Sequence, residues 1–130
     1  MSIRERVSGL AHIGIPTNDL TKTIRFFESI GFEMRLRTAT EKEQVAFLQL
    51  GNVMIETYEN GMAALKPGAI EHIALDVDDI EAVYAEVRGL GYKEFEDGIQ
   101  FLPFWEHGVR FFTIAGPNGE KIEFSQILDR

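Results

Sequence analysis

The stretch AHIGIPTNDLTKTIRFFESIGFEM, residues 11–34, decides the fold because the chain returns to its pattern at residues 71–94. The second stretch reads EHIALDVDDIEAVYAEVRGLGYKE, and the two align over their whole length without a gap. They share a histidine near the start, then an aspartate, a glycine and an aromatic residue: His12 and His72, Asp19 and Asp79, Gly31 and Gly91, and Phe32 and Tyr92. Such a repeat predicts two copies of one structural module.

The first copy predicts a strand, a helix and a glycine that ends the helix. Apolar residues alternate over residues 10–16, as they do in a half-buried strand. Asn18 or Asp19 can then cap a helix over residues 20–30, and Gly31 ends it. The copy therefore begins with a strand that leads directly into a helix.

The second copy predicts the same two elements. Residues 69–77 form the corresponding strand. Asp78, with Glu81 three residues later, is typical of a capping box at the start of a helix. The predicted helix runs to Leu90, and Gly91 ends it.

The later strands also correspond between the two copies. The strand VAFLQL of the first copy aligns with VRFFTI of the second, and VMIETYE aligns with KIEFSQI after turns that differ by three residues. This alignment places a glutamate on the last strand of each copy, Glu56 in the first and Glu123 in the second. Each copy therefore carries a histidine at its start and a glutamate at its end.

The chain is predicted to form one domain, residues 1–130. Module one covers about 8–60, a linker with glycine and proline covers about 60–68, and module two covers about 69–128.

The composition is that of a globular protein without thiol chemistry. The chain has 130 residues, 45% of them hydrophobic, and it has no cysteine, which excludes disulfides, thiolate zinc sites and thiol catalysis. Its 13 basic and 21 acidic residues give a net charge of −8, and no basic run offers a surface to nucleic acid. No apolar run approaches the ~20 residues of a membrane span, and the N-terminus lacks the core of a signal peptide. We therefore expect a cytoplasmic protein that binds neither nucleic acid nor membrane.

The two histidines and two glutamates of the repeat predict a metal site. Because strand side chains alternate between faces, His12 shares a face with Gly14, and His72 shares one with Ala74. These small neighbours leave room in front of each imidazole. Burying a glutamate on a sheet face without a partner costs free energy, so Glu56 and Glu123 each need a compensating charge. Two imidazoles and two carboxylates suit a first-row divalent metal and leave positions for water or substrate. Ion pairs between glutamate and histidine without a metal are the alternative.

Three motifs resemble a known superfamily over nearly the whole chain: HIGI at residues 12–15, EHIALDVDDI at residues 71–80 and GPNGEKIEF at residues 116–124. They are similar to the vicinal oxygen chelate superfamily, which includes glyoxalase I, fosfomycin-resistance proteins, extradiol dioxygenases, methylmalonyl-CoA epimerase and bleomycin-binding proteins. The resemblance implies an α+β fold of two tandem βαβββ modules, in which partly open mixed sheets with flanking helices form a cup.

The resemblance implies that His12, Glu56, His72 and Glu123 bind one divalent metal per site: nickel, cobalt, manganese, zinc or iron. The complete set is most similar to that of glyoxalase I, a lactoylglutathione lyase. It implies a lyase or isomerase acting next to a carbonyl, where the metal binds two neighbouring oxygens of a small-molecule substrate and stabilises an enediolate or enolate. Glu123 is the first candidate for the base that removes the proton, and Glu56 is the second. A homodimer is also implied, with each metal site formed within one chain or across two.

The resemblance leaves a glutathione cofactor open. Bacterial glyoxalase I usually has an arginine four residues after its first histidine, where this chain has Pro16. An asparagine four residues after the first glutamate is matched by Asn60, a candidate substrate contact. The sequence thus matches the metal ligands of glyoxalase I better than its thiol site.

The segment EDGIQFLPFWEHGVR, residues 96–110, has no counterpart in the first module and contains the only tryptophan. Aromatic loops with proline often cover a ligand pocket, so Trp105, His107 and Arg110 are candidate substrate contacts. The alternative is a loop that packs its aromatic residues on the rim of the barrel or on a dimer partner.

Other functions on the same scaffold stay open because one fold hosts several chemistries. A fosfomycin-type resistance enzyme, an epimerase and an extradiol dioxygenase are the enzymatic alternatives. A non-catalytic ligand-binding or resistance protein is the third class, although it does not need an ordered set of four metal ligands.

Overall fold

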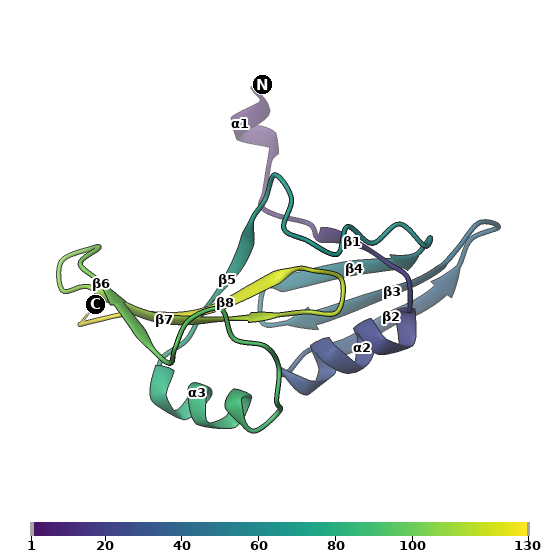
Figure 1. Ribbon diagram of the computed structural model, residues 1–130. Helices are drawn as coiled ribbons and strands as arrows, with labels where there is room; N and C mark the ends of the chain where they lie inside the picture. Colours follow the sequence, from purple (N-terminus) through teal and green to yellow (C-terminus); the bar gives the residue numbers. More distant parts are fainter. Residues whose placement is uncertain (1, 130) are drawn as a thin grey trace. The chain divides into compact units, whose positions relative to one another are not determined.

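The computed structural model describes residues 2–129 (Figure 1). The chain consists of two compact units, Met1–Ala63 and Ala64–Arg130. None of the helices in residues 2–129 is long and apolar enough to span a membrane.

The first unit is a four-stranded mixed sheet with one helix against it. After the one-turn helix α1 (Ile3–Arg6), its elements are β1 (Ile13–Thr17), α2 (Leu20–Ser29), β2 (Glu33–Ala39), β3 (Gln44–Leu50) and β4 (Val53–Glu59). The strand order is β1-β4-β3-β2, with β1 parallel to β4 and the other pairs antiparallel. Helix α2 packs against β2, β3 and β4.

The second unit repeats this topology. Its elements are β5 (His72–Asp76), α3 (Ile80–Arg88), β6 (Gln100–Leu102), β7 (Val109–Ala115) and β8 (Lys121–Ile127). The order is β5-β8-β7-β6, again with the first strand parallel to the last. The predicted α+β fold of two βαβββ modules with open mixed sheets is confirmed.

The segment after the second helix does have a counterpart in the first module, so that prediction is wrong. Strand β6 pairs with β7 at the place where β2 pairs with β3, and residues 103–108 form the hairpin connection. The edge strand is interrupted: Glu94 forms an isolated bridge to Ile114, and regular pairing with β7 resumes only at β6. A three-residue strand is too short to show a clear alternation of apolar residues, which hides it in the sequence.

Both helices begin at an aspartate and are tied to the last strand of their own module. The Asp19 carboxylate accepts a hydrogen bond from the Lys22 amide at 3.1 Å, as the first copy predicts. The amide of Leu20, the first helical residue, donates to Glu59 Oε1 at 2.9 Å. In the second module, the Ile80 amide donates to Gln126 Oε1 at the same distance.

The predicted cap of the second helix is off by one residue. Asp79, not Asp78, is the N-cap, and its carboxylate accepts from the Ala82 amide at 3.1 Å. The N-cap directly precedes the first helical residue, which is the buried Ile80. The helix also ends at Arg88 instead of Leu90, with Gly89 as its C-cap.

The two aspartates give a direct test of this correction. Asp79→Ala is expected to lower the free energy of unfolding by about 1 kcal/mol, because it removes the acceptor for an amide of the first helical turn. Asp78→Ala is the matched control and should change stability by less than about 0.5 kcal/mol. Urea denaturation of the two variants measures both values. Equal losses would show that Asp79 does not cap α3.

Each module has its own apolar core between the helix and one face of the sheet. In the first module Phe27 is fully buried and lies edge-on to Phe26 and Phe32, with ring centres 5.0 and 5.2 Å apart. In the second module Phe112 stacks on Phe124 at 5.0 Å. The helix covers one face of each sheet, so residues that alternate with this core lie on the opposite face.

Candidate metal centre

The first histidine–glutamate pair lies on the sheet face of module one that is opposite to α2. His12 lies within the predicted strand but directly precedes the observed β1, and its Nε2 lies 3.3 Å from Glu56 Oε1. Glu56 is opposite Gly14 and Phe47 in the strand ladder, and the His12 ring meets the Phe47 ring edge-on at 5.9 Å. A Cβ at position 14 would lie 3.9 Å from Glu56 Oε1 and 3.4 Å from the Tyr58 hydroxyl, which are ordinary contact distances, so the Tyr58 side chain lies beside Gly14 and Glu56.

The second pair lies at the corresponding place in module two. His72 is the first residue of β5, and its Nε2 lies 3.7 Å from Glu123 Oε1. Glu123 is opposite Ala74 and Thr113 in the ladder, so a small residue again stands beside the carboxylate. The Glu123 side chain is 20% exposed and the His72 side chain 45%, which leaves the imidazole accessible.

Two further carboxylates surround the second pair, and the sequence reasoning missed both. Glu71 Oε1 lies 2.9 Å from His72 Nδ1 and 3.6 Å from Lys121 Nζ. Glu96 accepts hydrogen bonds from the Thr113 amide at 2.7 Å and from the Thr113 hydroxyl at 2.9 Å. The position of Glu71, directly before the predicted ligand His72, could have indicated it from the sequence. Glu96 lies in the interrupted edge strand, where the sequence shows no alternation of apolar residues that would indicate which way its side chain points.

These groups set the electrostatics of the second pair. Burial raises the pKa of Glu123, the His72 side chain opposes this shift, and the charges of Glu96 and Glu71 add to it. The hydrogen bond from His72, followed by the charge of Lys121, lowers the pKa of Glu71. Glu123 therefore holds a proton more readily than an exposed glutamate, and Glu71 is more readily ionised.

The donor atoms fit a divalent metal. Metal–nitrogen and metal–oxygen bonds of about 2.1 Å at tetrahedral or octahedral angles place two neighbouring ligand atoms roughly 3.0–3.4 Å apart. The pair of His12 and Glu56 at 3.3 Å lies within this range, and that of His72 and Glu123 at 3.7 Å is slightly wider. Within residues 2–129 no three histidine, aspartate or glutamate side chains form one metal-binding group.

The predicted substrate contacts have other partners in their own modules. The Asn60 side chain accepts from the Met62 amide at 2.9 Å and so stabilises its own turn. Trp105 is 71% exposed in the β6–β7 connection with φ +63°, and His107 lies 3.7 Å from Glu106. Arg110 pairs with Glu81 of α3 at 3.3 Å, on the face of β7 opposite to that of Thr113.

Comparison with known proteins identifies a sequence relative and fold relatives. The uncharacterized protein YwbC of Bacillus subtilis (strain 168) is 32% identical over 124 residues, which cover 88% of this chain and 94% of YwbC. The structure of the glyoxalase family protein from Enterococcus faecalis has a TM-score of 0.75 at 21% identity and covers 91% of this chain and 97% of that chain. The fosfomycin resistance protein FosX from Listeria monocytogenes, in complex with Mn(II) and sulfate, has a TM-score of 0.74 at 18% identity and covers 95% of each chain.

A family model decides the assignment. The two structural likenesses, at such low identity, show the fold, which is the same paired-module architecture. The model of the Glyoxalase/Bleomycin resistance protein/Dioxygenase superfamily matches residues 9–124, a range that contains both histidine–glutamate pairs. The chain therefore belongs to the Glyoxalase/Bleomycin resistance protein/Dioxygenase superfamily.

Proposed function

We propose that the protein is a cytoplasmic, homodimeric, metal-dependent lyase or isomerase of the glyoxalase I kind, which acts on a small molecule next to a carbonyl group. The observation that carries this proposal is the duplicated pair of one imidazole and one carboxylate, at 3.3 Å in module one and 3.7 Å in module two. Each pair stands on the sheet face that the helix leaves uncovered, beside a residue no larger than alanine. Packing of the core does not require a charged side chain at these positions, nor the same histidine and glutamate at equivalent places in both modules.

We propose that the four side chains together hold one divalent cation: His12, Glu56, His72 and Glu123. When bound, such a cation supplies Lewis-acid polarisation of a carbonyl oxygen. Nickel, cobalt, manganese, zinc and iron all accept this donor set. Ala74 stands opposite Glu123, and the Tyr58 hydroxyl lies beside Gly14 and Glu56, where it can donate a hydrogen bond to a substrate oxygen.

Glu123 is the proposed base. Its carboxylate takes the proton from the hydroxyl-bearing carbon next to the carbonyl and returns it to the former carbonyl carbon. The hydroxyl proton moves to the former carbonyl oxygen, which completes the isomerisation. Glu56 is the corresponding carboxylate of module one.

The test compares the metal content of the wild-type protein with that of variants at two of its three histidines. We expect about one divalent metal per chain in the wild-type protein after loading and purification. His72→Ala should lose this metal, because it removes one of four ligands, whereas His107→Ala should retain it as the matched control. No metal in the loaded wild-type protein, or equal content in both variants, would overturn the proposed site.

Activity then separates the chemistries. Metal-loaded protein is assayed with methylglyoxal and glutathione, and turnover that disappears in His72→Ala establishes the glyoxalase reaction. Bound metal without turnover of methylglyoxal, with or without glutathione, would contradict that reaction and favour the fosfomycin-type, epimerase or dioxygenase alternatives. A protein that binds no metal but still binds small molecules would be a non-catalytic binding protein.

A further inference from the structure

We propose that Glu71 is a positioning residue that fixes the ring of His72, and that Lys121 holds Glu71 in place. The metal-binding consequence rests on the proposed function, whereas the state of the His72 ring can be tested without a metal. The three residues come from the start of β5 and of its parallel neighbour β8 in module two.

The two nitrogens of the His72 ring face two different carboxylates. Nδ1 lies 2.9 Å from Glu71 Oε1, which is hydrogen-bond distance, and Nε2 lies 3.7 Å from Glu123 Oε1. An ionised carboxylate can only accept, so in the neutral ring Nδ1 carries the proton and Nε2 keeps its lone pair. The contact with Glu71 thus turns the unprotonated nitrogen toward Glu123, where a metal ligand is needed.

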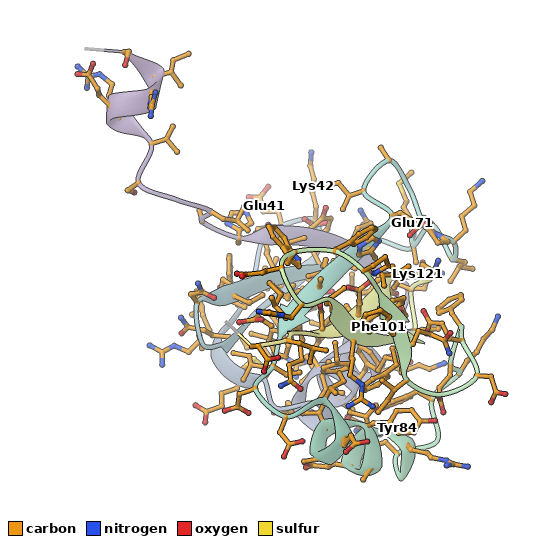
Figure 2. The ribbon with its side chains drawn as sticks, turned by 90° about the vertical axis from the view of Figure 1, so that its left-hand side faces the viewer. Glu41, Lys42, Glu71, Tyr84, Phe101 and Lys121 are labelled. Carbon is orange, nitrogen blue, oxygen red and sulfur yellow. The ribbon has the colours of Figure 1, made fainter. Side chains whose placement is uncertain are left out.

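Lys121 explains why an exposed glutamate can act in this way. His72 and Lys121 are direct partners in the β5–β8 ladder, so their side chains stand side by side. Lys121 Nζ lies 3.6 Å from Glu71 Oε1, and Figure 2 shows the two side chains as neighbours. The same Nζ lies 4.6 Å from the centre of the Phe95 ring, and the lysine side chain is only 21% exposed. The aromatic ring and the carboxylate together hold the ammonium group.

The first module lacks this arrangement at the level of sequence. In the alignment of the two copies, Ala11 takes the place of Glu71 and Met54 takes the place of Lys121. The alanine side chain cannot accept a hydrogen bond from an imidazole, and the methionine side chain cannot form an ion pair with a carboxylate. We therefore infer that the two halves of the site differ, with His72 oriented before a metal binds and His12 oriented by its edge-on contact with Phe47.

The first experiment is nitrogen-15 NMR of the histidine side chains in the metal-free protein, at a pH where the rings are neutral. Wild-type His72 should show the proton on Nδ1. In Glu71→Ala the ring of His72 should show a mixture of the Nδ1-protonated and Nε2-protonated tautomers. The His12 signals should stay unchanged, which also shows that the variant is folded. Glu106→Ala is the matched control, because Glu106 also precedes a histidine and lies 3.7 Å from its ring.

The second experiment measures affinity for Mn(II) or Zn(II) alone. Glu71→Ala should weaken binding about 10–100-fold, the usual effect of removing a carboxylate behind a histidine ligand. Lys121→Met, which copies module one, should weaken it in the same direction but by less. Glu106→Ala should leave the affinity unchanged.

The outcomes separate this inference from the proposed function. An unchanged His72 ring in Glu71→Ala would overturn the positioning role, even if the wild-type protein binds metal as proposed. Metal affinity that stays unchanged in Glu71→Ala would overturn its consequence for the site. If the wild-type protein takes up no metal, the proposed function fails, and the NMR result alone decides whether Glu71 fixes the ring.

Discussion

Replacing Glu123 by glutamine is expected to lower kcat about 10²–10⁴-fold while the metal stays bound. Glutamine keeps the size of the side chain and an oxygen that can serve as a ligand, but it cannot take up the proton that the proposed reaction transfers. The measurements are steady-state kinetics on the substrate that the wild-type protein turns over, and metal content of the same sample. Full activity in this variant would rule out Glu123 as the base, and loss of the metal would mean that the lower kcat reports its role as a ligand instead of its role as the base.

Glu56→Gln is the matched control for this prediction, and the structure gives a reason to expect a smaller loss. Glu56 lies opposite Phe47 in its ladder, whereas Glu123 lies opposite Thr113, which is hydrogen-bonded to Glu96. The negative charge of Glu96 adds to the burial that raises the pKa of Glu123. A larger loss of kcat in Glu56→Gln than in Glu123→Gln would exchange the two roles.

Replacing Phe27 by alanine is expected to lower the free energy of unfolding by about 3–5 kcal/mol. The ring is fully buried between α2 and its sheet and touches two other phenylalanines, so its removal loses apolar burial and leaves a cavity. This is a large part of the ~5–15 kcal/mol that a typical domain has. Urea denaturation measures the loss, and hydrogen exchange shows which strands are exposed by it.

Phe104→Ala is the matched control for the core substitution. Phe104 is 57% exposed in the β6–β7 connection, so its removal should change stability by less than about 0.5 kcal/mol. If Phe27→Ala costs less than about 1 kcal/mol, the packing of α2 does not depend on this ring. A large loss in Phe104→Ala would show that the hairpin tip is covered in solution.

The duplicated topology could be predicted from the sequence because its signals are local. An alternating strand, an aspartate before the helix and a glycine after it occupy the same places in both copies, and each acts over a few residues. The alignment also matched His12 with His72 and Glu56 with Glu123, so that each copy carries one histidine and one glutamate. The structure brings each pair together because the first and last strands of a module are parallel neighbours in its sheet.

Tertiary structure alone decided which other side chains reach these pairs. Glu96 reaches Thr113 because the edge strand breaks after Glu94, and nothing in the local pattern marks that break. Arg110 is in a plausible segment for a substrate contact, but the register of β7 turns it toward α3 and Glu81.

The sequence by itself thus determined two modules, their helix boundaries to within two residues and the duplicated set of candidate ligands, since all of these follow from short-range periodicity and the repeat. The contact between Glu71 and Lys121 depends on the register of two strands that are far apart in the sequence. Such a register is set by hydrogen bonds and packing over the whole sheet. For that physical reason, the supporting charges around His72 became visible only in the folded chain.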